Sequence, residues 1–95
     1  MSSLGYLESL DQLSAETVDM HRALVSLTEE LEAIDSYNQR VDVCHDKSLR
    51  SILEHNRDEE KEHAAMLLEW IQRNDQTFSK HFKAVLFSKK KIADK

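Results

Sequence analysis

Apolar residues recur along two long stretches of the chain at alternating intervals of four and three positions. This spacing places them on one face of an α-helix, as in helices that pack together in a bundle. The first stretch carries Met20, Leu24, Leu27, Leu31 and Ile34. The face of the second stretch consists of Leu49, Leu53, Asn56, Glu60, His63, Leu67 and Trp70. The pattern predicts long helices over residues 15–43 and 47–73, the second with polar side chains on its packing face.

Local signals mark where these helices begin and end. Ser14 and Asp46 are suitable N-caps for the two helices. Asn74 is predicted to end the second helix, because Asn tolerates the left-handed conformation of many helix C-termini. Residues 44–46 leave room for only a short turn, so the two helices are expected to be antiparallel neighbours. A shorter helix is predicted after Asp75. Its apolar face would consist of Phe78, Phe82, Val85 and Leu86.

The expected fold is all-α, an antiparallel two-helix hairpin with a short C-terminal helix. We expect an N-terminal arm over residues 1–13, the hairpin with its third helix over residues 14–87, and a basic C-terminal end over residues 88–95. Composition agrees with this fold, because the 95-residue chain has one Gly and no Pro and therefore few turn residues. Two helices bury little apolar surface on their own, so we expect the chain to oligomerise.

Charge and cysteine content narrow the classes of function. A formal net charge of -5 argues against nucleic acid or an anionic membrane as the main partner. The single cysteine, Cys44, excludes a disulfide framework within one chain and fits a reducing, cytosolic setting. Residues 1–10 lack the pattern of a signal peptide. No apolar run approaches the roughly 20 residues that span a membrane.

The candidate chemistry lies where the two packing faces become polar. Glu60 and His63 are three positions apart and point the same way from their helix. Glu30 lies about as far before the turn as Glu60 lies after it, so at about 1.5 Å rise per residue the two are nearly level. Imidazole suits Fe(II), and carboxylates can bridge two metal ions. Two such hairpins supply four Glu and two His, the ligand set of di-iron carboxylate bundles. The sequence predicts a di-iron site shared between two copies.

A second interpretation stays open from these residues alone. Glu30 and Glu60 would then lie at the edge of the packing face with their carboxylates in water, and His63 would be a core histidine with an ordinary hydrogen-bond partner. Charged side chains are rarely buried unless they are paired or bind metal. Three candidate ligands at matched depth therefore favour the metal site.

Several segments between Glu16 and Asp75 also carry a family resemblance. They are MHRA at 20–23, EELEAID at 29–35, QR at 39–40, HNRDEEKEHAAM at 55–66 and LEW at 68–70, together with Tyr37. On these residues the chain resembles the encapsulated ferritins, which are ferritin-like proteins housed inside encapsulin nanocompartments. The resemblance implies a ferritin-like four-helix bundle completed by dimerisation through iron, with five dimers forming a ring-shaped decamer.

The resemblance also implies roles for individual residues. Residues matching Glu30, Glu60 and His63 from both chains form the ferroxidase centre, which holds two iron ions per pair of subunits. Residues matching Glu29 and Glu32 form an outer site that attracts iron and can hold other divalent cations. Tyr37 matches a tyrosine near the centre and joins the catalytic set.

The implied reaction is the oxidation of Fe(II) to Fe(III) by oxygen. The implied partners are further copies of the chain and, where a C-terminal docking peptide is present, the encapsulin shell protein. That shell stores the mineral inside a nanocompartment in the cytoplasm. Neither nucleic acid nor a membrane is implied as a partner. A non-enzymatic helical dimerisation or metal-binding module is the alternative function.

Two features depart from the family pattern. Ser36 stands where the family has Trp, which changes the packing near the centre and with it the expected rate. The chain also stops at Lys95, before the flexible tail and short apolar peptide that dock family members to the shell. We expect that this segment was removed from a longer chain, the alternative being a member that works outside shells.

Overall fold

Three α-helices and one short 3-10 helix form the part of the chain that this computed structural model describes, residues 5–93. The 3-10 helix η1 spans Leu10–Gln12, α1 spans Ala15–Val43, α2 spans Lys47–Arg73 and α3 spans Gln76–Val85. No strand occurs among these described residues. The all-α fold is confirmed, and both long helices have the predicted bounds. None of the described helices combines the length and apolar character needed to cross a bilayer.

The predicted division into an arm, a hairpin and a basic end stays a prediction. Residues 1–4 of the arm and 94–95 of the basic end lie outside the described residues. The described part of the arm contains η1, and the chain after α3 has no further helix up to residue 93.

Side-chain caps explain where each α-helix begins. The Ser14 hydroxyl accepts a hydrogen bond from the Thr17 amide at 3.1 Å. The Asp46 carboxylate accepts from the Leu49 amide at 2.8 Å, and Asp75 does the same for Phe78 at 2.9 Å. Each cap satisfies an amide of the first turn that has no partner within its helix. The predicted caps at Ser14 and Asp46 are confirmed.

The end of α2 differs from the prediction in its backbone conformation. Asn74 follows the last helical residue, but its φ of -113° and ψ of 11° are not left-handed. Its side-chain amide donates to the Trp70 carbonyl at 2.9 Å. Asn74 therefore caps α2 with its side chain. A left-handed residue is unnecessary here, since the next residue, Asp75, is already the extended N-cap of α3.

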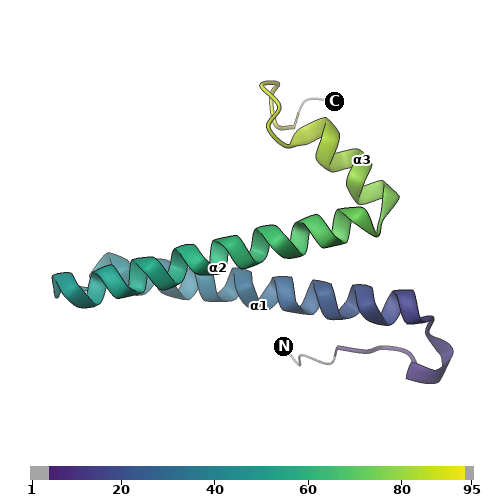
Figure 1. Cartoon of the computed structure of the whole chain (residues 1–95), viewed down its shortest axis with the longest axis horizontal. Coiled ribbons are helices and arrows are strands. Elements are labelled where there is room, and N and C mark those ends of the chain that lie inside the picture. Colours follow the sequence, from purple (N-terminus) through teal and green to yellow (C-terminus); the bar gives the residue numbers. More distant parts are fainter. Residues whose placement is uncertain (1–4, 94–95) are drawn as a thin grey trace.

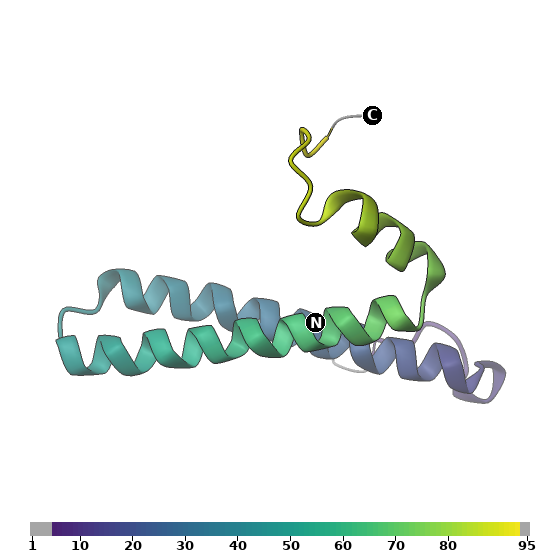
Figure 2. The ribbon, with the colours of Figure 1, turned by 45° about the horizontal axis from the view of Figure 1, so that its top comes forward.

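The two long helices form a hairpin from which α3 projects. α1 and α2 lie side by side along the length of the molecule, and α3 turns away from the end of α2 (Figure 1). The same arrangement is visible when the molecule is rotated, with α1 and α2 connected at one end by a short turn (Figure 2). The molecule measures 50 × 38 × 19 Å. The predicted antiparallel hairpin with a short third helix is confirmed.

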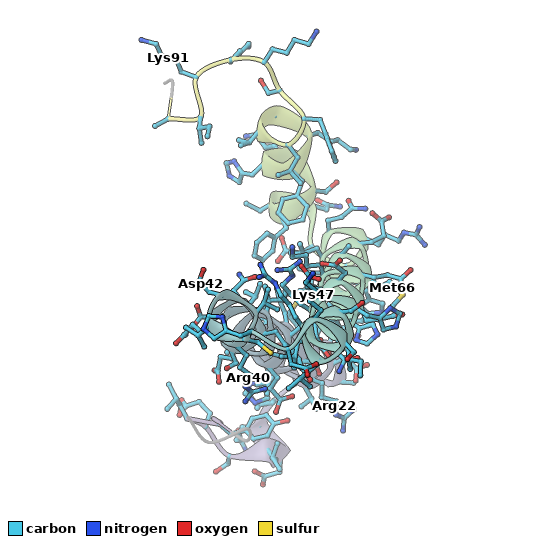
Figure 3. The ribbon with its side chains drawn as sticks, turned by 90° about the vertical axis from the view of Figure 1, so that its left-hand side faces the viewer. Arg22, Arg40, Asp42, Lys47, Met66 and Lys91 are labelled. Atoms are coloured by element: carbon cyan, nitrogen blue, oxygen red, sulfur yellow. The ribbon has the colours of Figure 1, made fainter. Side chains whose placement is uncertain are left out.

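The hairpin has almost no core of its own. Among the described residues, the buried hydrophobic side chains are Ala23, Val41, Ala64 and Ile71. Residues from the predicted packing faces remain open to solvent, with Leu31 53% and Trp70 39% exposed. Met66, beside that face on α2, is 58% exposed and points away from α1 (Figure 3). One copy therefore leaves apolar surface that a second copy could cover, and completion of a four-helix bundle stays a prediction.

Candidate metal centre

Glu30 of α1 and Glu60 and His63 of α2 converge in the middle of the hairpin. One ligand atom from each side chain lies within 4.8 Å of the other two. The Nδ1 atom of His63 is 3.5 Å from Glu30 Oε2 and 3.6 Å from Glu60 Oε2. Atoms that bind one metal ion at about 2.0–2.2 Å lie roughly 3–4 Å from one another. The cluster is thus close to the spacing that a shared cation requires.

The hairpin explains why these three residues meet. Glu60 and His63 lie one turn apart on the same face of α2, within one unbroken helix. The short turn between α1 and α2 brings the middle of α1, with Glu30, opposite the middle of α2. No other group of three such side chains meets the same distance criterion in the described part of the chain.

Burial makes this cluster costly without a cation. The side chains of Glu30 and Glu60 are 22% and 25% exposed, and that of His63 is 42% exposed. The Oε2 atom of Glu30 is enclosed and makes no hydrogen bond to the described residues; its contact with His63 Nδ1, at 3.5 Å, is too long for a good one. A buried carboxylate oxygen with only such a long contact loses its hydration for little in return. A metal ion bound between the three side chains would restore that interaction, so the residues present fit a metal.

The electrostatics point the same way. The pKa of Glu30 lies above its ordinary value of 4.5, first because two carboxyls this close share a hydrogen bond only when one is protonated. Burial and the negative charge of Glu60 raise that pKa further, while His63 opposes the rise. Two carboxylates held together in this way favour the arrival of positive charge, either a proton or a metal ion.

The other predicted site residues lie apart from the cluster. Glu29 and Glu32 are exposed on α1, and neither belongs to the converging group. Tyr37 is half-buried two turns beyond Glu30, about 10 Å further along α1. The guanidinium of Arg40 lies over its ring, 5.3 Å from the ring centre. The arrangement therefore brings together three of the predicted residues and leaves Glu29, Glu32 and Tyr37 outside the immediate cluster.

Comparison with known proteins adds an independent observation. The profile of the family described as EncFtn-like matches residues 5–89. The chain belongs to this family. The predicted membership of the encapsulated ferritins is thereby confirmed.

Relatives of this EncFtn-like protein extend the comparison. It is 56% identical over 87 residues to the encapsulated ferritin-like protein of Rhodospirillum rubrum, a match that covers 92% of this chain and 62% of that relative. It is 48% identical over 89 residues to a ferritin-like protein of Thermotoga maritima, covering 94% of this chain and 78% of that relative. The chain therefore spans less than two thirds of the length of the Rhodospirillum relative.

A solved structure also resembles this EncFtn-like chain. The crystal structure of a protein from Nitrosomonas europaea superposes with a TM-score of 0.90 at 64% sequence identity. The match covers 95% of this chain and 99% of that one. At this level of identity, the helical hairpin and its third helix are a shared fold.

Sequence reasoning missed one polar contact near the three converging side chains of this EncFtn-like protein. Arg57 Nη1 donates to Asn38 Oδ1 across the hairpin at 3.4 Å, and Arg57 Nε donates to Asp58 Oδ1 at 3.2 Å. A single Arg beside a packing face is typically solvent-exposed, so the residue type alone did not predict a contact with the other helix. Its position one turn before Glu60 was the available clue.

Proposed function

We propose that this protein is a ferroxidase that oxidises Fe(II) to Fe(III) with oxygen. The observation that carries the proposal is the convergence of Glu30, Glu60 and His63 around an enclosed, unbonded carboxylate oxygen. Two carboxylates and one imidazole form a ligand set that suits iron in both oxidation states. Membership of the EncFtn-like family supports iron as the metal.

A second copy of the chain completes the proposed centre. One hairpin offers three ligand side chains, whereas a di-iron centre in a helical bundle draws on four Glu and two His from four helices. Two copies facing each other across a two-fold axis supply that set. The apolar side chains left exposed on the two long helices, including Leu31 and Trp70, are surface that such a partner could bury.

In this proposal the protein only has to hold the iron ions and balance their charge while oxygen oxidises them. Each Fe(II) gives up one electron, and oxygen is the electron acceptor. The Glu30 and Glu60 carboxylates would hold the metal ions and offset the positive charge that oxidation adds, since both are anionic when a metal displaces the shared proton. The His63 imidazole supplies a neutral ligand to each half of the centre.

The remaining predicted residues have supporting roles in this proposal. Glu29 and Glu32 attract iron, and other divalent cations, from solvent toward the centre. Tyr37 lies near the centre within the assembled bundle and belongs to its catalytic set. Five such dimers form a ring-shaped decamer. The oxidised iron would pass to an encapsulin shell in the cytoplasm, where the mineral is stored. The name of the Rhodospirillum relative, an encapsulated ferritin-like protein, supports only the enclosure in a shell.

The test is the rate of iron oxidation in air. Purified protein should oxidise Fe(II), followed by ferric absorbance, faster than buffer alone. Glu30→Ala and His63→Ala should each return the rate to that of buffer. Glu62→Ala is the matched control, because Glu62 is an exposed acid of α2 outside the cluster. Wild-type protein no faster than buffer, or full activity in the two site variants, would overturn the proposal.

The exposed apolar surface also favours a second candidate, a helical module that dimerises by packing alone and binds metal only incidentally. The two functions differ in how association responds to metal, because a shared interfacial site links binding and assembly. Sedimentation measured with and without Fe(II) under anaerobic conditions separates them. Assembly that is indifferent both to Fe(II) and to His63→Ala would favour the module.

A further inference from the structure

Arg57 differs from the other ion-paired arginines of the hairpin. Its side chain is 21% exposed, whereas those of Arg22, Arg50 and Arg73 are 71%, 49% and 70% exposed. Those three pair with acids within one turn of their own helix. Arg57 instead reaches α1, where Nη1 donates to Asn38 Oδ1 at 3.4 Å. It is the arginine of this group that joins the two long helices.

The position of this contact relates it to the metal cluster. Arg57 precedes Glu60 by one turn of α2, so the two side chains leave the same side of the helix about 4.5 Å apart along its axis. Asn38 lies eight residues after Glu30 in α1, on the same side of the cluster as the hairpin turn. The bridge therefore joins the helices on the turn side of the cluster, one turn from Glu60 on α2 and about 12 Å from Glu30 along α1.

We propose that Arg57 and Asn38 are a positioning pair that sets the height of α1 along α2, and thereby holds Glu30 level with Glu60 and His63. This inference deepens the proposed function and rests on it only in assuming that the cluster binds metal. Metal sites lose affinity when their ligands are displaced, and residues that orient ligands commonly contribute tenfold or more. Apolar contacts alone restrain sliding weakly in this hairpin, because few side chains are buried.

The pair acts through geometry rather than through the charge of Arg57. The groups that move the pKa of Glu30 are Glu60 and His63, and Arg57 is not among them. One arm of the guanidinium is held by Asp58 while the other reaches Asn38, and this fork has no counterpart in Lys. Arg57→Lys should therefore fail to replace Arg57 although it keeps the charge.

The experiment measures Co(II) binding by its visible absorption, which reports ligand geometry as well as affinity. Asn38→Leu removes the acceptor at an exposed position where folding should tolerate the change. It should weaken Co(II) binding about tenfold and alter the absorption bands. Asn38→Asp keeps an acceptor for Arg57 and should bind Co(II) close to wild type. Arg57→Leu should match Asn38→Leu, and the double variant should be no weaker than either.

Arg50→Leu is the control, since Arg50 lies on the same helix and pairs with Glu54 of that helix, at 4.0 Å. Wild-type affinity in Asn38→Leu, an equal loss in Asn38→Asp, or additive losses in the double variant would each overturn the positioning pair. A second readout needs no metal, because the same variants should lower the melting temperature of the metal-free protein non-additively. Additive shifts would also show that Arg57 and Asn38 do not act as a pair.

Failure of the proposed function gives a different result. His63→Ala would then bind Co(II) like wild type, and the melting temperatures of the single and double variants would still test the positioning pair.

Discussion

Glu30 is the residue whose surroundings disfavour the stability of the metal-free fold but favour the proposed binding of metal. Its Oε2 atom is enclosed without a hydrogen-bond partner, and the carboxylate lies beside that of Glu60. A side chain selected only for stability at this position would be neutral. The arrangement would become favourable once a cation binds, so the metal-free hairpin bears a cost that the proposed metal-bound centre would remove.

This cost has a definite pH dependence. Because the pKa of Glu30 is raised above 4.5 in the folded protein, the fold binds this proton more tightly than the unfolded chain does. The contribution of Glu30 to stability is therefore fully present below pH 4.5 and is lost as pH rises through the folded value. Glu30→Gln removes the titration, so the metal-free variant should melt above wild type at neutral pH and lose this advantage below pH 4.5.

Thermal unfolding followed by circular dichroism, in the presence of a chelator, measures the difference. Glu29→Gln is the control, because Glu29 is the adjacent residue but is exposed and outside the cluster. It should leave the pH dependence of the melting temperature unchanged. A Glu30→Gln variant that melts below wild type at neutral pH would contradict this account of the site.

At the scale of elements, the helix boundaries follow from a few local hydrogen bonds. Asp46 accepts from the amide of Leu49 and from the hydroxyl of Ser48, and both lower its pKa below the ordinary value of 3.8, the amide more strongly. Because this cap starts α2 directly after the turn, it also contributes to the height at which Glu60 and His63 face Glu30.

Asp46→Ala should therefore lower the melting temperature at neutral pH. The cap stabilises through its ionised form, so its contribution is present above the ordinary pKa of 3.8 and disappears as pH falls through the lower folded value. The gap between wild type and variant should shrink on acidification. Glu62 is an exposed acid within the same helix, so Glu62→Ala should melt at the same temperature as wild type at neutral pH. Equal melting temperatures for Asp46→Ala and wild type at neutral pH would contradict the capping role.

Periodicity and capping signals were enough to predict both long helices and their antiparallel packing. Those features depend on neighbours within a few positions, which a sequence displays directly. The conformation of Asn74 was mispredicted because it depends on the helix that starts at the next residue. The convergence of Glu30 with Glu60 and His63 followed from matched distances to the turn.

The contacts that could not be predicted are those that depend on the crossing of the two helices. The hydrogen bond from Arg57 to Asn38 joins residues 19 positions apart, and neither residue type predicts it. Periodicity also placed Leu31 and Trp70 on the apolar faces of the first and second helix, yet it could not say whether the same chain covers those faces. The structure shows that it does not.

At the scale of the whole molecule, the hairpin is thin and incompletely packed. Trp70, the single tryptophan, lies two turns beyond His63 on the same face of α2 and is 39% exposed. A second copy seated on the metal cluster would cover part of it. Metal binding and burial of this indole are thus expected to occur together.

Zn(II), which is redox-inactive, should shift the fluorescence of Trp70 to shorter wavelength as association buries the ring. His63→Ala should abolish the shift, while Glu62→Ala should retain it. The measurement is an emission titration at protein concentrations where the metal-free chain does not self-associate. A shift of equal size in wild type and His63→Ala would show that burial of Trp70 is unrelated to the proposed centre.

The most direct test of the shared ferroxidase centre is a crystal structure of the iron-loaded protein with anomalous scattering measured at the iron edge. The account predicts two iron ions related by the two-fold axis between two copies, held by the Glu30, Glu60 and His63 side chains of both copies. Iron held by a single copy, or iron bound elsewhere with this cluster empty, would contradict it.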